Sequence, residues 1–473
     1  MPDLPGGEPR PPSESRIAAL LARRAGVPAA RAGDQLRVHP DRLLLDGPTA
    51  AAVIDTFQLP PARPSRPRAA ATAGATASST APSPSPHVVE PERFLAVAGA
   101  AQPRAEQRRV AAFAAAHGWA LALQPALAGL PSVVATDEGL VGSGDVVAGA
   151  RPDTGSLGGL GCATLRCDPA ELAGLLDDPR LQVVVPATRF VRVSGRLPRW
   201  VGPFDLALAV LEAAGGVPAL RGAVLELHGA TLDEMEVAER LALCGALAAA
   251  GVGSLVAPDR RTAAWLAARR ARAEPPAAPL DVAPPPESAW IAVDARRVML
   301  AALQLGAPGP AGGPLGPLPG RRLDPAAPPA GKPGRAERAA KASADPSGAP
   351  VAAVGEIFLG GRIEDLRVAG EVLRDRNVRR GLFLGIQPAS QRVLLHAIEE
   401  GLAADFLRAG ASLLPPGAAP PPASGGELRL LTSGGGPGDV VVGPAVAAAS
   451  AVAGRLCDPE GMRRSNRRAA RLG

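Results

Sequence analysis

The chain has 473 residues, of which 47% are hydrophobic, 20% are charged and 3% are aromatic. This length and apolar content suit two or three domains with buried cores, and they exclude a wholly disordered chain. No run of about eighteen apolar residues is free of charge and proline, and the first residues are polar, so we expect neither a membrane span nor a secretion signal. The sequence therefore predicts a cytoplasmic protein.

The formal net charge of +6 comes almost wholly from arginine, because Lys332 and Lys341 are the only lysines. Basic residues are spread along the chain, apart from a cluster between Arg463 and Arg471. Aromatic side chains, on which single-stranded nucleic acids stack, are scarce, and tyrosine is absent. The composition therefore disfavours nucleic-acid binding.

Proline-rich stretches divide the chain, because they lack the apolar periodicity that would offset the entropy of ordering them. We predict a folded N-terminal segment (1–59), a Pro/Ala/Ser-rich linker (60–86), an α/β domain (87–283), a strand followed by a Gly/Pro-rich insertion (284–350), a C-terminal α/β domain (351–460) and a basic tail (461–473).

Strands and helices alternate within both α/β domains. In the first, the pattern predicts strands at 183–185, 190–193, 223–227 and 254–257, and helices at 204–214, 234–250 and 262–272. In the second, it predicts strands at 353–359 and 381–386, and helices at 363–374 and 390–400. This alternation is typical of α/β sheets covered by helices, and we expect two such layers.

Several short motifs resemble one enzyme family. The run GGRIEDLRVAG at 360–370 and the segment Gln387-Pro388-Ala389-Ser390 resemble the large subunit of 3-isopropylmalate dehydratase, in the isopropylmalate and homoaconitate branch of the aconitase superfamily. Further pieces match in the same order from about residue 15 to about residue 460. The resemblance implies a multi-domain fold of α/β/α layers with mixed or parallel sheets.

The same resemblance implies a four-iron four-sulfur cluster held by three cysteines, which acts as a Lewis acid on the substrate. The first family cysteine would fall between Gly360 and Gly361, which are joined directly here. The other two positions align with Ala418 and Pro421, which offer no ligating side-chain atom. We therefore expect no cofactor and no metal site.

The family's acid–base residues are also replaced. Its Asp-Ser-His-Thr motif aligns with the segment from Arg151 to Thr154, so a histidine position carries Asp153. Histidine is the side chain that normally titrates near pH 7, and its loss removes the expected base. Asp46 and Asp153 are the residual catalytic candidates.

Three residues are candidates for binding a substrate carboxylate. Arg151 and Arg362 supply guanidinium groups, and Ser390 lies in the matched Pro-Ala-Ser motif. Glu364 and Arg367 are spaced to share one helix face, and we expect a structural ion pair between them.

The remaining cysteines and histidines are expected to be structural. Four cysteines are too few and too scattered for a disulfide framework. Cys162, Cys167 and Cys244 are interpreted as core residues. The histidines are dispersed, and none falls on a catalytic position of the family.

These observations favour an inactive relative of the dehydratase large subunit that serves as a scaffold binding a ligand or a protein. The resemblance implies a small, swivelling-domain partner and a small carboxylic acid as binding partners. One alternative is a hydro-lyase or isomerase of hydroxy acids that uses Asp46, Arg151 and Asp153 in a rebuilt site. Another alternative is RNA binding, suggested by analogy with aconitase relatives and by the basic charge.

Overall fold

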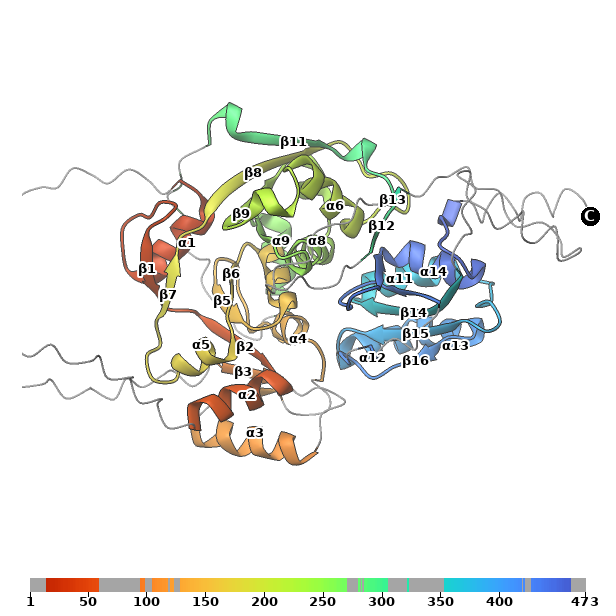
Figure 1. Cartoon of the computed structure of the whole chain (residues 1–473), viewed down its shortest axis with the longest axis horizontal. Helices are drawn as coiled ribbons and strands as arrows, with labels where there is room; N and C mark the ends of the chain where they lie inside the picture. The colour runs from red at the N-terminus through yellow and green to blue at the C-terminus, as the bar shows by residue number, and fades with distance from the viewer. Residues whose placement is uncertain are drawn as a thin grey trace, which may run out of the picture.

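The computed structural model places three large sheets and their helices in one assembly (Figure 1). It describes residues 14–58, 94–97, 104–117, 120–122, 128–269, 280, 282, 285–304, 321–322, 353–418, 420–421 and 427–460. The predicted linker and basic tail, and most of the predicted insertion, lie outside these residues. Within the described part, no helix is long and apolar enough to cross a membrane.

The first large sheet has five parallel strands in the order β4-β3-β2-β5-β6. Its strands are β2 (Arg42–Asp46), β3 (Phe94–Val97), β4 (Ala120–Ala122), β5 (Val146–Gly149) and β6 (Ala163–Arg166). The helices near it are α2 (Gly47–Gln58), α3 (Arg104–His117), α4 (Pro131–Asp137) and α5 (Pro169–Gly174). Leu43 and Leu45 of β2 enter one core and Leu44 enters another, as expected where both faces of a strand are covered.

The second sheet has four parallel strands in the order β10-β9-β8-β11, and Figure 1 shows β8 and β11 side by side along one edge. Its strands are β8 (Ala187–Ser194), β9 (Ala223–His228), β10 (Gly253–Val256) and β11 (Trp290–Asp294), and its helices are α6 (Pro203–Ala213), α7 (Ala230–Glu234), α8 (Val237–Ala249) and α9 (Arg260–Ala267). Helix α1 (Arg16–Ala25) precedes a separate two-stranded sheet of β1 (Gln35–Val38) and β7 (Leu181–Val184).

The glycine-rich segment after β5 forms a 3-10 helix, η3 (Pro152–Leu160), packed against α8. A Cβ on Gly158 would lie 1.9 Å from the Ser254 carbonyl oxygen, and one on Gly159 would lie 2.5 Å from the Leu241 nitrogen. Only glycine permits such close approach of backbones. Packing therefore explains these glycines without a bound phosphate.

The third sheet has seven strands in the order β13-β12-β18-β17-β14-β15-β16. Its strands are β12 (Ala301–Gln304), β13 (Arg321–Arg322), β14 (Val354–Gly361), β15 (Phe383–Pro388), β16 (Ser412–Leu413), β17 (Leu428–Leu431) and β18 (Val440–Val442). Helices α11 (Ile363–Leu373), α12 (Gln391–Glu399), α13 (Leu402–Ala409) and α14 (Pro444–Ala453) complete this C-terminal unit. Strand β12 is antiparallel to β13 and β18, so the sheet is mixed.

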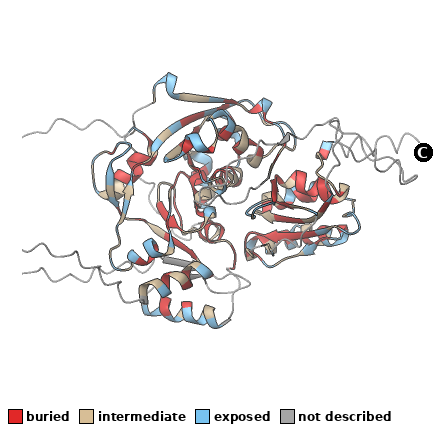
Figure 2. Ribbon diagram, in the orientation of Figure 1, coloured by how far each residue is buried: buried red, intermediate tan, exposed pale blue. Residues whose placement is uncertain are grey.

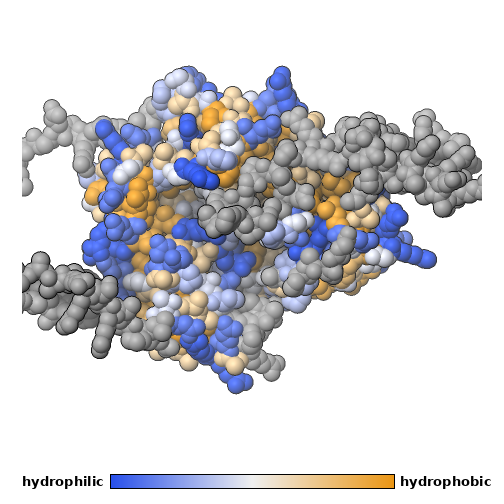
Figure 3. Space-filling view, viewed as in Figure 1, coloured by the Kyte–Doolittle hydropathy of each residue, from blue (hydrophilic) through white to orange (hydrophobic). Residues whose placement is uncertain are grey.

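The predicted α/β class with parallel and mixed sheets is confirmed. The expected number of layers is wrong, because three large sheets occur in the described residues. The additional sheet consists of β2 to β6, which precede the strands predicted from residue 183 onward, and the strand predicted at 183–185 pairs antiparallel with β1 outside the three large sheets. Figure 2 shows a buried interior in each part of the assembly, and Figure 3 shows hydrophobic and hydrophilic residues interspersed over the visible described surface.

A short backbone pairing joins the N-terminal part to the C-terminal unit. Gly129 forms an isolated antiparallel bridge with Ser390. The Leu130 amide donates to the Ala389 carbonyl at 2.8 Å, and the Gln391 amide donates to the Ala128 carbonyl at 2.7 Å. Helix α4 follows this pairing directly, so its position is fixed against the C-terminal unit.

The buried carboxyl group of Asp205 makes stability depend on pH. Its side chain lies at the start of α6 and accepts hydrogen bonds from the Gly202 amide at 2.9 Å and the Ala301 amide at 2.8 Å. The residue is only 2% exposed, and burial raises its pKa from 3.8 to about 7 although both amides oppose this. The folded protein therefore binds this proton more tightly than the unfolded chain.

The stabilising contribution of this proton is fully present below about pH 4 and is lost as the pH rises to about 7. We predict that the free energy of unfolding of the wild type, relative to Asp205→Asn, falls over this interval. Denaturant unfolding at several pH values measures it. Asp259→Asn is the control of opposite sign, because its hydrogen bonds from Arg240 and Thr262 and the Arg240 charge together outweigh burial and lower the pKa of Asp259 to about 2. A pH-independent difference for Asp205→Asn would contradict the assignment.

Candidate functional site

Three predicted site residues meet at the carboxyl ends of two neighbouring parallel strands. Asp46 is the last residue of β2, and Arg151 and Asp153 follow the end of β5. Because β2 and β5 are paired in parallel, their carboxyl ends lie at one edge of the sheet. Ligands of α/β proteins commonly bind at such an edge. The predicted grouping of Asp46, Arg151 and Asp153 is therefore present.

These side chains form a closed network. Arg151 donates from Nη1 to Asp46 Oδ2 at 2.9 Å and from Nε to Asp153 Oδ1 at 2.8 Å. The Thr49 amide donates to Asp46 Oδ1 at 2.9 Å, and Ser132 Oγ donates to Asp153 Oδ2 at 2.8 Å. Each of the four carboxylate oxygens therefore has a donor within the protein.

Arg151 is the most accessible member of the network. Its side chain is 39% exposed, whereas the side chains of Asp46 and Asp153 are 15% and 18% exposed. Burial disfavours the charged guanidinium, but the Asp153 and Asp46 carboxylates outweigh it and raise the pKa of Arg151. The hydrogen bonds to the two carboxylates use Nε and Nη1, and no residue in the described part of the chain bonds to Nη2.

The other two candidates lie in a second group around Asp137. Arg362 donates from Nη2 to Thr136 Oγ1 at 2.9 Å, and its Nη1 lies 3.6 Å from Asp137 Oδ1. Ser390 caps α12 by accepting from the Val393 amide, and it donates to Asp137 Oδ2 at 3.3 Å. Arg362 and Ser390 therefore lie close together because both contact Asp137, which was not among the predicted site residues.

The two groups lie at opposite ends of α4. Ser132, near the start of this helix, bonds to Asp153 in the first group. Asp137, its last residue, bonds to the second group. Ser132 and Asp137 are separated by a little over one helical turn, and neither was among the predicted site residues.

Strand β14 runs into α11 without an intervening loop. Gly361 ends the strand, and Arg362 caps the helix. The Thr432 hydroxyl group bonds to both the amide and the carbonyl of Gly360, at 2.8 and 2.6 Å. A Cβ on Gly361 would lie 2.3 Å from Asp365 Oδ2. The direct Gly360–Gly361 junction is therefore closely packed.

The predicted ion pair between Glu364 and Arg367 is not the one that forms. Arg367 makes a bidentate pair with Glu400, just after α12, with N–O distances of 2.8 and 2.5 Å. Two parallel hydrogen bonds to one carboxylate are stronger than a contact along one helix face. Glu364 instead lines a cavity beside Arg362.

The four cysteines are separated from one another. Cys244, Cys167, Cys162 and Cys457 each contact a different hydrophobic cluster, and the first three are buried. Burial raises the pKa of both Cys167 and Cys244 to about 12, so these thiols stay protonated. Core packing is therefore confirmed as the environment of Cys162, Cys167 and Cys244.

Comparison with known proteins decides the family. Residues 20–283, more than half of the chain, match the family model described as the aconitase family (aconitate hydratase). The chain belongs to the aconitase family. A protein of Moorella thermoacetica is 26% identical over 93% of this chain and 97% of its own length. One from Campylobacter curvus is 28% identical over 70% and 76%, and one from Nitratidesulfovibrio vulgaris is 30% identical over 61% of each. All three are named 3-isopropylmalate dehydratase large subunit.

This membership contradicts the expectation that the protein has no cofactor, because aconitases and dehydratase large subunits normally bind a four-iron four-sulfur cluster. The residues that the structure describes do not themselves fit that group. They contain no set of three or more His, Cys, Asp or Glu side chains that could hold a metal ion. Gly360, Gly361, Ala418 and Pro421, at the aligned positions, have no ligating side-chain atoms.

Removing Arg151 tests whether its ion pairs hold the network of Asp46, Arg151 and Asp153 together. Arg151→Met leaves two largely buried carboxylates facing each other without their cation. We predict a loss of about 1–3 kcal/mol in the free energy of unfolding, measured by denaturant titration at neutral pH.

The control is Arg408→Met, which breaks an exposed pair with Asp405 at 2.6 Å and should cost less than about 1 kcal/mol. Replacing Asp46 and Asp153 by asparagine in the Arg151→Met background should recover part of the loss. Equal effects of the two arginine substitutions would contradict the closed network.

Proposed function

We propose that this chain is a non-catalytic member of the aconitase family that binds a small carboxylic acid in the cytoplasm. The observation that carries the proposal is the closed network of Asp46, Arg151 and Asp153. A general base must accept a proton from the substrate through a free lone pair within hydrogen-bond reach. Here Arg151, Ser132 and the Thr49 amide donate hydrogen bonds to all four carboxylate oxygens, which leaves lone pairs free but holds both acids against a fixed cation, so the network favours binding over proton transfer.

Arg151 is the proposed contact for the ligand carboxylate. Its guanidinium is half-buried and held charged by two acids, and its Nη2 points to no partner among the described residues. Charge-assisted hydrogen bonds from a pre-positioned guanidinium cost little further ordering of the side chain. Such a site suits a small anion better than it suits a neutral molecule.

The other hypothesis is a hydro-lyase or isomerase of hydroxy acids that uses Asp153 as the acid–base group. Asp153 would then have to accept a proton through a lone pair that its bonds to Arg151 and Ser132 leave free. Among the described residues, no observation favours RNA binding over these two hypotheses.

The first test combines binding with turnover. 3-Isopropylmalate should bind to the wild type by titration calorimetry, and Arg151→Gln should weaken binding by about tenfold or more. No dehydrated product should form, either as purified or after anaerobic incubation with iron and sulfide. Arg408→Gln is the matched control and should bind as the wild type does. Turnover that is abolished by Asp153→Asn would establish the hydro-lyase hypothesis instead.

A second chain is the other proposed partner. The relatives are named as large subunits, and we propose that this chain likewise contacts a small-subunit type of protein from its own organism. The two proteins should co-elute in size-exclusion chromatography after co-expression. Separate elution at concentrations well above micromolar would contradict this part of the proposal.

A further inference from the structure

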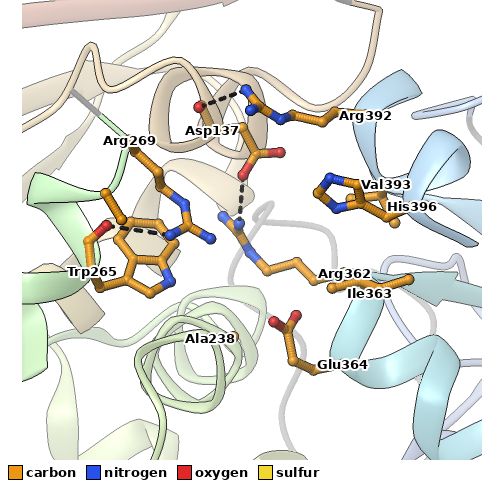
Figure 4. A pocket seen from close by; sticks show the side chains of 11 residues that line it. Asp137, Ala238, Trp265, Arg269, Arg362, Ile363, Glu364, Arg392, Val393 and His396 are labelled. Atoms are coloured by element: carbon orange, nitrogen blue, oxygen red, sulfur yellow. Dashed lines mark hydrogen bonds and ion pairs between the residues drawn. The ribbon is translucent and has the colours of Figure 1, made fainter. Parts of the chain in front are cut away.

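A cavity of about 220 Å³ lies between the N-terminal part and the C-terminal unit (Figure 4). Residues at the end of α4, the start of α8 and the end of α9 line one side, and residues of α11 and α12 line the other. This volume lies below the roughly 300–1,000 Å³ of pockets that hold drug-sized ligands. It therefore suits a very small organic molecule.

Two of the arginines at this cavity already have acidic partners. Arg362 lies beside Asp137, with Nη1 and Oδ1 3.6 Å apart. Arg392 donates to the Asp137 carbonyl at 3.1 Å and to Glu138 Oε1 at 3.2 Å. These contacts join the two walls of the cavity, and they place the Asp137 carboxylate beside Arg362.

Arg269 has no acidic partner among the described residues. Its guanidinium lies 3.6 Å from the centre of the Trp265 ring, and its Nη1 donates to the Trp265 carbonyl at 3.2 Å. Burial lowers its pKa, and the charges of Arg362 and Arg392 lower it further, although the charges of Asp137 and Glu364 oppose this. A guanidinium stays charged at neutral pH, so Arg269 presents a cation that lies over the Trp265 ring and forms no ion pair within the described part of the chain.

Glu364 supplies the opposite charge on the other wall. No hydrogen bond or ion pair joins it to any residue that the structure describes, and Figure 4 shows its carboxylate turned into the space beside Ala238 and Arg362. Its charge acts on Arg269, so the two groups are within electrostatic range without forming an ion pair.

We propose that this cavity binds a small zwitterion of the α-amino-acid type, with its carboxylate on Arg269 and its ammonium group on Glu364. A zwitterion satisfies both unpaired charges at once, whereas a simple anion or cation satisfies one and leaves the other unneutralised. Ile363 and Val393 line the same cavity and provide apolar contact for a small aliphatic side chain. The site does not involve Arg151, so it is independent of the proposed carboxylic-acid site.

A ligand bound in this cavity would also stabilise the association of the N-terminal part with the C-terminal unit. Arg269 belongs to the N-terminal part, and Glu364 belongs to the C-terminal unit. A ligand bound to both favours the assembled state, and it raises the temperature of unfolding in proportion to the logarithm of its concentration. The amino acid would thus stabilise the arrangement of α4 between its two neighbours.

Titration calorimetry and thermal unfolding with glycine, L-alanine, L-valine and L-leucine test this proposal on the full chain. At least one of them should bind at millimolar concentration, and its methyl ester and its N-acetyl derivative should each bind about tenfold more weakly or worse. Failure of all four amino acids to bind would overturn the proposal. Equal affinity for the amino acid and its two blocked derivatives would also overturn it.

Two variants assign the contacts. Arg269→Met should weaken amino-acid binding by about tenfold or more and abolish the penalty for the methyl ester. Glu364→Gln should weaken it similarly and abolish the penalty for the N-acetyl derivative. Arg367→Met, on the same helix as Glu364 but paired with Glu400 outside the cavity, is the control and should bind as the wild type does. Unchanged binding in both cavity variants would contradict the assignment.

Discussion

The backbone pairing of Gly129 with Ser390 holds the two parts of this molecule in register. A Cβ on Gly129 would lie 2.7 Å from the Ala389 carbonyl oxygen and from Ser390, and a Cβ on Gly417 would lie equally close to the Gly129 backbone. Three backbone segments therefore meet where no side chain fits between them. Helix α4 starts two residues after Gly129, so this contact sets the direction of the helix and its position relative to the C-terminal unit.

Both groups of charged residues depend on the position of α4. Ser132 reaches Asp153 in the N-terminal sheet, while Asp137 reaches Arg362 and Ser390 in the C-terminal unit. Acids in both groups are engaged by arginine, so each group is a charged lining held in place by ion pairs. Arg269 and Glu364, which form no ion pair among the described residues, line the cavity that Asp137 at the end of α4 also lines. The two binding proposals rest on this arrangement.

The sequence predicted elements well where the pattern was local. The apolar run at 353–359 and the amphipathic segment at 363–374 correspond to β14 and α11. Partners that depend on tertiary structure were not predictable. Helix spacing favoured a pair of Glu364 with Arg367, but it could not show that Glu400 offers a bidentate partner. Likewise, the parallel pairing of β2 with β5 brought Arg151 to Asp46, while the orientation of Ser132 toward Asp153 follows from the position of α4.

Hydrogen exchange at the junction tests the central claim most directly, namely that the Gly129 pairing locks α4 between the two parts. The Leu130 amide bonds to Ala389 and the Gln391 amide bonds to Ala128. The account predicts that peptides covering these amides exchange as slowly as peptides from β14 and β15 in the core of the C-terminal unit, because all open only when the molecule unfolds. Rapid exchange at Leu130 and Gln391 beside slow exchange in β14 would contradict it, since the two parts would then separate without unfolding.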